Sequence, residues 1–128
     1  MIIENKIEQY LIDMKLTCLQ MDENLWLLDD EDQSLQGVAV MFSDPLVIIR
    51  AEIMDIPKKN LLELYTKLLE LNSSEVIHGA YAIDKQKIIL IDTLQYDSMS
   101  FENFRASLES ISLALSRHYP ILSVYREK

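Results

Sequence analysis

The sequence predicts an α+β fold, a twisted antiparallel sheet of about five strands with three helices in the order α-β-β-β-α-β-β-α. Two observations predict this class. Apolar residues recur at helical spacing in three segments, and short apolar runs of strand character lie between those segments. Brief polar connections join the runs, and connections that short allow only antiparallel pairing. The 128 residues show no linker composition and no internal repeat, so we expect one domain over residues 1–128.

The first helix is predicted over residues 2–15, where every third or fourth side chain is apolar. A strand-like run over 16–21 follows, then a polar turn at 22–24 and a second short run at 25–28 that contains Trp26. The apolar face of the helix consists of Ile3, Ile7, Tyr10, Leu11 and Met14.

An acidic loop ending at Gly37 precedes two further strands, predicted over 38–42 and 46–54. Pro45 belongs to the turn between them, because proline has no N–H to donate to a ladder. Along 46–54 one face is apolar, whereas the other mixes apolar and charged side chains. The first face is Val47, Ile49, Ala51 and Ile53, and the second is Leu46, Ile48, Arg50 and Glu52.

The central segment reads as a helix followed by a hairpin. The helix, predicted over 58–71, opens after Pro57 and ends at Asn72. The two hairpin strands are predicted over 76–83 and 87–94. The apolar line of the helix is Leu61, Leu64, Tyr65, Leu68 and Leu71; in the second hairpin strand Ile88 and Leu90 face one way, and Ile89 and Ile91 the other.

The third helix is predicted over 100–118. Ser100 is a good N-cap, and Met99 and Phe104 occupy the positions of a hydrophobic staple around it. Pro120 should break or kink the helix, and it could start a short terminal segment. From these patterns we expect a core that includes Val47, Ile49, Leu64, Leu68, Phe104 and Leu108.

The second face of the sheet needs a cover. A half-solvated antiparallel strand should alternate apolar with polar residues, yet several strands here are apolar on both faces. Either the chain's own helices cover both faces, or a second chain covers one of them. The sequence leaves both alternatives open.

Composition and charge exclude several functions. A net charge of −9 is unfavourable for nucleic acid and for anionic membrane surfaces, both of which select clustered Lys and Arg. No apolar run approaches the ~20 residues that a membrane-spanning helix requires, and the N-terminus lacks a signal-peptide core. Cys18 is the one cysteine, so no internal disulfide can form. We therefore expect a reduced, cytoplasmic protein.

No motif indicates catalysis, a metal or a cofactor. Aligned from Asp30, a calcium loop would need Gly and Glu where Leu35 and Met41 stand. His78 and His118 have no partner at metal-ligand spacing, and two glycines cannot build a phosphate loop. A nucleophilic pair of Cys18 with a histidine has no supporting motif. We expect no catalytic residue, no metal and no cofactor.

One stretch carries a family resemblance. LLELYTKLLELN, a Leu-rich helix ending in Leu71-Asn72, leads into HGAYAIDKQKIILIDTL with Gly79-Ala80-Tyr81 at the start of a strand. This pattern resembles the YbjN-type branch of the type III secretion chaperone-like (Tir-chaperone) proteins, and the order of elements agrees over nearly the whole chain.

The resemblance implies a bacterial, non-enzymatic protein that is commonly a homodimer and that holds an extended or partly unfolded client on apolar strips. An extended client can add to a strand edge or lay a helix into a groove. We expect protein-binding anchors on the second sheet face and beside it, namely Trp26, Met41, Phe42, Leu46, Ile48, Ile89 and Ile91. The alternatives are a dimeric regulator with a folded partner, and a small enzyme using Cys18 and a histidine.

Overall fold

The computed structural model describes residues 5–126 and builds them into one antiparallel sheet with helices. The strand order is β1-β2-β3-β4-β6-β5, and every neighbouring pair is antiparallel. The elements are α1 (Lys6–Asp13), β1 (Cys18–Asp22), β2 (Leu25–Asp30), β3 (Leu35–Ser43), β4 (Leu46–Asp55), α2 (Leu61–Ser74), β5 (Ala80–Asp84), β6 (Lys87–Gln95), α3 (Phe101–Leu122) and a 3-10 turn, η1 (Ser123–Tyr125).

The α+β class predicted from the sequence is confirmed, and the strand count was slightly low. The sheet has six strands, four of them before α2, where the sequence predicted about five with three before the helix. The difference arises at the N-terminal end, where both short apolar runs are complete strands of one hairpin. Cys18 pairs with Leu28, and the ladder continues to the turn at residues 22–25.

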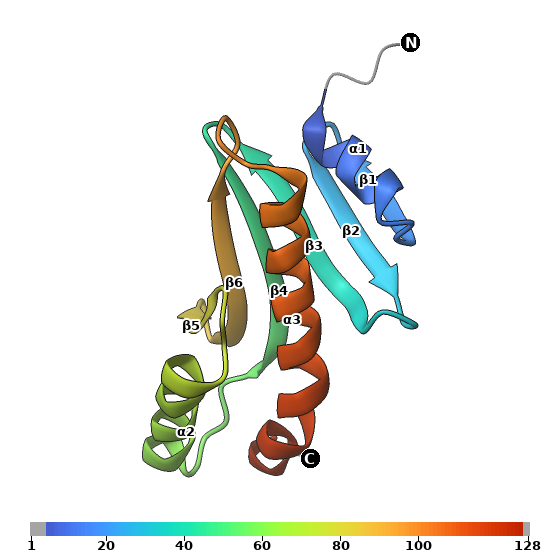
Figure 1. Cartoon of the computed structure of the whole chain (residues 1–128). Helices are drawn as coiled ribbons and strands as arrows, with labels where there is room; N and C mark the ends of the chain where they lie inside the picture. Colours follow the sequence, from blue (N-terminus) through green and yellow to red (C-terminus); the bar gives the residue numbers. More distant parts are fainter. Residues whose placement is uncertain (1–4, 127–128) are drawn as a thin grey trace.

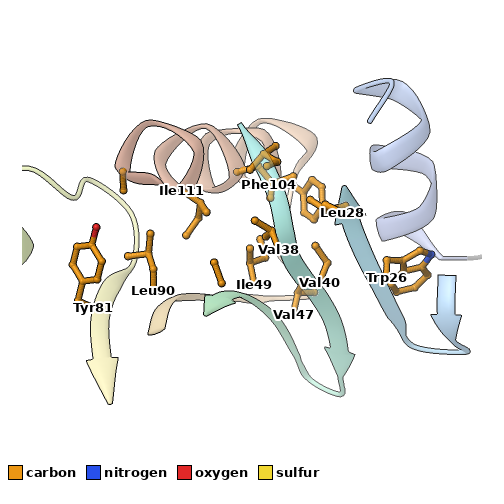
Figure 2. Packing of buried hydrophobic residues seen from close by; sticks show 14 of the residues in the cluster. Trp26, Leu28, Val38, Val40, Val47, Ile49, Tyr81, Leu90, Phe104 and Ile111 are labelled. Atoms are coloured by element: carbon orange, nitrogen blue, oxygen red, sulfur yellow. The ribbon is translucent and has the colours of Figure 1, made fainter. Parts of the chain in front are cut away.

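Helices α1 and α3 lie on the same side of the sheet, and α2 lies beyond its β5 end (Figure 1). The core fills the space between this helical layer and the sheet (Figure 2). Phe104, Leu108 and Ile111 of α3 are fully buried there, against strand residues that are also inaccessible to solvent. All six core residues expected from the sequence are buried: Val47, Ile49, Leu64, Leu68, Phe104 and Leu108.

The first helix is shorter than the predicted range 2–15. Helix α1 ends at Asp13, and Asn5 caps its start by accepting a hydrogen bond from the N–H of Ile7 at 2.7 Å, whereas Ile3 of the predicted face lies outside the described residues. The start of α3 follows the sequence signal. Ser100 caps α3 in a reciprocal pair with Asn103, and the staple residue Met99 is buried beside it, as predicted.

Both ends of α2 and the end of α3 also differ from the prediction. Helix α2 begins at Leu61 rather than at residue 58, because Asn60 adopts a left-handed backbone with a φ of 60° that cannot belong to an α-helix. It continues past Asn72 to Ser74. Helix α3 does not end at residue 118 but continues through Pro120 to Leu122. Proline removes one backbone donor from the last turns, and the following 3-10 turn closes the segment.

Strand β5 is also shorter than predicted. It begins at Ala80 instead of residue 76, because Gly79 turns the chain with a φ of +97°. A Cβ at Gly79 would lie 2.8 Å from the backbone oxygen of Ile91, which is closer than real contacts allow. The close approach at Gly79 is therefore to strand β6.

The packing of α3 on the sheet predicts a large cost for shortening a buried leucine. Leu108→Ala should lower the free energy of unfolding by about 2–5 kcal/mol, because it leaves a cavity under a rigid helix. Leu113→Ala is the matched control, since that leucine lies on the same helix and is 45% exposed. Urea denaturation measures both. Equal midpoints for the two variants would show that α3 packs by another face.

Candidate functional site

The two faces of the sheet have different surroundings, and the strand register assigns each side chain to one of them. One row across the sheet joins Trp26, Val40 and Ile49, and these side chains point into the core. The neighbouring row joins Leu25, Met41 and Ile48, which point to the opposite, outer face. Neither α1 nor α3 lies on that outer face (Figure 1).

The chain's own polar side chains cover the β6–β5 half of the outer face. Arg50 of β4 donates a hydrogen bond from Nη1 to Oδ2 of Asp84 in β5 at 3.0 Å, so the ion pair reaches across β6. Its two ends lie in the rows on either side of Ile89, which is 3% exposed although it faces outward. Lys87 adds ion pairs to Asp55 at 2.6 Å and to Glu52 at 3.9 Å on the same half.

The β1–β4 half of the outer face carries apolar side chains without such a cover. We call these residues the outer strip. Leu19 is 63% exposed, and Met41 and Leu46 are each 36% exposed. The strip consists of Leu19, Leu25, Leu27, Ala39, Met41, Leu46 and Ile48, placed together by the β1–β2, β2–β3 and β3–β4 registers. Soluble monomers seldom leave such a contiguous patch in water.

The structure separates the seven anchors expected from the sequence. Met41, Leu46 and Ile48 lie together on the outer strip. Ile91 shares the outer face but is separated from the strip by Arg50, its partner in β4. The other three do not belong to the strip. Trp26 is 3% exposed on the core face beneath α1 (Figure 2), Phe42 is half-buried on that same face against the Tyr96 ring, and Ile89 lies under the Arg50–Asp84 pair.

The two edges of the sheet differ as well. Strand β5 pairs only with β6, yet the backbone of Tyr81 is not left free. The Asn72 side chain accepts from the Tyr81 N–H at 2.7 Å and donates to the Tyr81 carbonyl at 3.3 Å. One amide thus satisfies the outward backbone groups of β5 at Tyr81. At the other edge, within residues 5–126, β1 pairs only with β2, and its residues beyond Cys18 are exposed. Asn72 therefore obstructs strand addition at the β5 edge, whereas the β1 edge has no such side chain bonded to it among these residues.

Tyr81 is held at its hydroxyl too. The hydroxyl lies 2.6 Å from Nδ1 of His118 on α3, in a buried hydrogen bond whose donor depends on the imidazole tautomer. Burial lowers the pKa of His118 and raises the pKa of Tyr81. Both shifts favour the neutral pair. Tyr81 therefore connects α2, through Asn72, to the last turns of α3.

A second apolar surface lies between α2 and β5. It is a groove of about 270 Å³ lined by Tyr65, Leu68, Leu69, Asn72, Tyr81, Ala82 and Ile83, which we call the α2–β5 groove. Leu69 is 68% exposed and Ile83 is 53% exposed at its rim. Leu62, seven residues before Leu69 on the same side of the helix, is the most exposed large apolar side chain among the described residues.

Candidate catalytic groups do not come together. Cys18 lies in β1, whereas His118 contacts Tyr81 in β5, across five strand spacings or about 24 Å. His78 is also on the β5 side, bonded through its backbone to Ser110. Burial raises the pKa of the Cys18 thiol, which disfavours a reactive thiolate. The enzyme alternative thus loses its proposed residue pair.

One residue of the acidic loop, Asp30, has a structural role that the sequence did not reveal. Asp30 is buried, and its carboxylate accepts from the N–H groups of Thr17 at 3.0 Å and Gln33 at 3.1 Å. The Thr17 bond is the main reason that the pKa of Asp30 is lowered.

Across residues 5–126 we find no group of three or more His, Cys, Asp or Glu side chains arranged to hold a metal. Within the same range no helix is long and apolar enough to span a membrane.

Comparison with known proteins places the whole fold. The family model CesT_Tir_1, which describes type III secretion chaperones, matches residues 3–128. No curated protein matches the sequence.

Three solved structures share the architecture. YbjN, a putative transcription regulator from E. coli, has 19% identity and a TM-score of 0.68 over 90% of this chain and 89% of its own. The heterodimeric ExoU–SpcU complex from the type III secretion system of Pseudomonas aeruginosa contains a chain with 15% identity and a TM-score of 0.66 over 92% and 98%. The ExsC–ExsE complex gives 12% identity and a TM-score of 0.56 over 91% and 93%. At these identities the likeness establishes the fold.

The two hydrogen bonds between the Asn72 side chain and the Tyr81 backbone, which we call the amide clamp, predict graded effects of substitutions at Asn72 on stability. Asn72→Ala should cost about 1–3 kcal/mol of unfolding free energy, because the Tyr81 N–H and carbonyl both lose their partner. Asn72→Asp should cost less, since a carboxylate can still accept from the N–H. Ser73→Ala, one residue away and exposed, is the control. Thermal or urea unfolding measures all three variants. If Asn72→Ala and Asn72→Asp have the same unfolding midpoint as Ser73→Ala, the amide clamp does not stabilise the fold.

The buried His118 predicts a pH dependence of stability. Its folded pKa lies below the ordinary value of 6.5, so below that pH the unfolded chain binds more protons than the folded one. Stability should therefore fall as the pH drops from 7.5 toward 5.5. Glu75 opposes the shift and Arg117 adds to it. His118→Gln keeps an acceptor but does not titrate, so its urea midpoints should be flatter over this range. Parallel slopes for His118→Gln and wild type would contradict the assignment, and His78→Gln controls for the exposed histidine.

Proposed function

We propose that this chain, which belongs to the CesT_Tir_1 family of type III secretion chaperones, is a non-enzymatic protein-binding module that holds an extended segment of another protein on its outer strip. The observation that carries the proposal is the coincidence of the bare outer strip with the open β1 edge. The complexes among the solved structures of this fold, ExoU–SpcU and ExsC–ExsE, agree with a partner-binding role.

An extended segment suits this surface for a physical reason. A chain lying along β1 can satisfy its backbone hydrogen bonds with the unpaired groups of that strand, and its alternate side chains then face the sheet's outer side. Leu19 lies on β1 itself, and Leu27 and Ala39 continue its row into the sheet. The β5 edge offers no equivalent, because Asn72 already occupies it.

The α2–β5 groove supports a different contact, and we assign the proposed homodimer to it. Its exposed residue Leu69 belongs to helix α2, as does the exposed Leu62 one heptad earlier, and Ile83 lies on the adjoining strand. Two copies related by a two-fold axis would bury the same residues on each other, the commonest closed arrangement of identical chains. The outer strip then remains free for the client.

A photo-crosslinking experiment tests the client surface. A photoreactive amino acid at Met41 should capture a polypeptide in the native cell, because this side chain lies in the middle of the outer strip. The control is the same group at Leu113 on α3, an exposed apolar position on the other side of the molecule. The adduct should also disappear when Leu19→Asp is added. Equal adducts at Met41 and Leu113 would contradict the proposed client surface.

Light scattering tests the dimer. Wild type at tens of micromolar should have about twice the monomer mass, and Leu69→Asp should lower that mass while leaving helical content unchanged. Leu113→Asp, which places the same charge on α3, should remain dimeric. A monodisperse wild-type monomer would contradict the dimer but leave the client surface untouched. A dimer lost only by Met41→Asp would place the dimer contact on the outer strip instead.

A further inference from the structure

We infer that the segment held on the outer strip is basic as well as apolar, with Lys or Arg side chains alternating with or flanking its apolar anchors. This inference rests on the proposed function and specifies the chemistry of the client. It follows from how charge is distributed along the strands that form the strip.

The strands of the strip come from a stretch of sequence without any cation. Residues 16–49 contain no Lys, Arg or His, although they contain seven carboxylates. The nearest cations along the chain are Lys15 and Arg50 at its two borders, and Arg50 is paired with Asp84. The seven carboxylates are those of Asp22, Glu23, Asp29, Asp30, Glu31, Asp32 and Asp44.

The fold distributes these carboxylates at both ends of the strip. Asp22 is the last residue of β1, and Glu23 lies in the β1–β2 turn, which the hydrogen bond from the Phe42 N–H to the Asn24 carbonyl ties to the end of β3. Asp44 lies in the β3–β4 turn at the same end. The remaining four are at the other end, around the β2–β3 connection. Of the seven, only Asp30 is buried.

Within residues 5–126 the six exposed carboxylates form no ion pair. The ion pairs formed within residues 5–126 join Arg50, Lys67 and Lys87 to acids on α2 and on the β4–β6–β5 side. None of them involves an acid of residues 16–49. Acids on the covered half of the sheet are therefore paired with Arg50 and Lys87, whereas the exposed carboxylates of residues 16–49 are not paired with cations of residues 5–126. Like charges gathered around an apolar surface repel an acidic partner and attract a basic one.

The alternation of side chains along a strand makes the partner's chemistry more specific. If an extended segment adds to β1, every second side chain faces the outer strip and the rest point the other way or beyond its ends. Apolar residues are suited to the first set. Cations at the two ends of the segment would meet the carboxylates of the β1–β2 turn and of the β2–β3 connection.

Three synthetic peptides of equal length test the inference. Each alternates Leu or Ile with one other residue, which is Lys in the first, Gln in the second and Glu in the third. Fluorescence anisotropy with the wild-type chain should give an affinity for the Lys peptide about tenfold or more above that for the Glu peptide, the scale of several exposed ion pairs acting together. The difference should shrink as salt is raised from 50 to 500 mM, because solvent-exposed charges are screened.

Two triple variants separate a local effect from net charge. Asp22→Asn, Glu23→Gln and Asp44→Asn together should reduce the preference for the Lys peptide several-fold. Glu63→Gln, Glu70→Gln and Glu75→Gln remove the same net charge at exposed positions on and at the end of α2, on the β5 side of the sheet, and should leave the preference unchanged. Equal loss in both triples would overturn the inference, since net charge alone would then explain it.

The outcomes distinguish this inference from the proposed function. If all three peptides bind equally and Met41→Asp abolishes binding of each, the client surface stands and the basic chemistry is overturned. If the Lys peptide is preferred and Met41→Asp weakens it, both stand. If no peptide binds, or if Met41→Asp changes nothing, the proposed client surface fails and the inference fails with it.

Discussion

The fold depends on how Tyr81 is held at both of its ends. The Asn72 amide binds its backbone, and the imidazole of His118 is hydrogen-bonded to its hydroxyl. These contacts join α2, the edge strand β5 and the end of α3, three elements that are distant in sequence. Buried polar groups must be paired, so neither helix can shift from β5 without leaving one unsatisfied. The same amide occupies the β5 edge, and the sheet is left with one open edge at β1.

The second consequence is a division of the sheet's outer face. A sheet with helices on one side must leave its other face to solvent, to a partner or to its own long side chains. Here the β6–β5 half uses Arg50, Asp84 and Lys87 to cover Ile89. The β1–β4 half has no such cover, and no cation along its sequence from residue 16 to residue 49. The β6–β5 half is thus covered by the chain's own charged side chains rather than by its helices, and a cover for the β1–β4 half by another chain stays a prediction.

Much of the fold could be predicted because its signals are local. Helical spacing, caps such as Ser100 and the alternation along β4 depend on neighbours in sequence, and the structure agrees with them. Contacts between distant residues could not be predicted. The burial of Ile89 depends on an ion pair 34 residues apart, and that of Trp26 depends on α1 covering β2. The polar anchors Asn72 and His118 had no signal beyond their presence, although Asn72 belongs to the Leu-Asn pair that carried the family resemblance.

The central claim is that an extended polypeptide is held at the open edge and on the outer strip, while the clamped edge stays closed. Hydrogen–deuterium exchange measures this directly, with the chain alone and with the alternating Leu-Lys peptide bound. The account predicts slower exchange of the β1 amides, residues 18–22, on binding, and unchanged exchange of the β5 amides, residues 80–84. Protection of β5 with β1 unchanged would contradict it, because the peptide would then have displaced the amide that closes that edge.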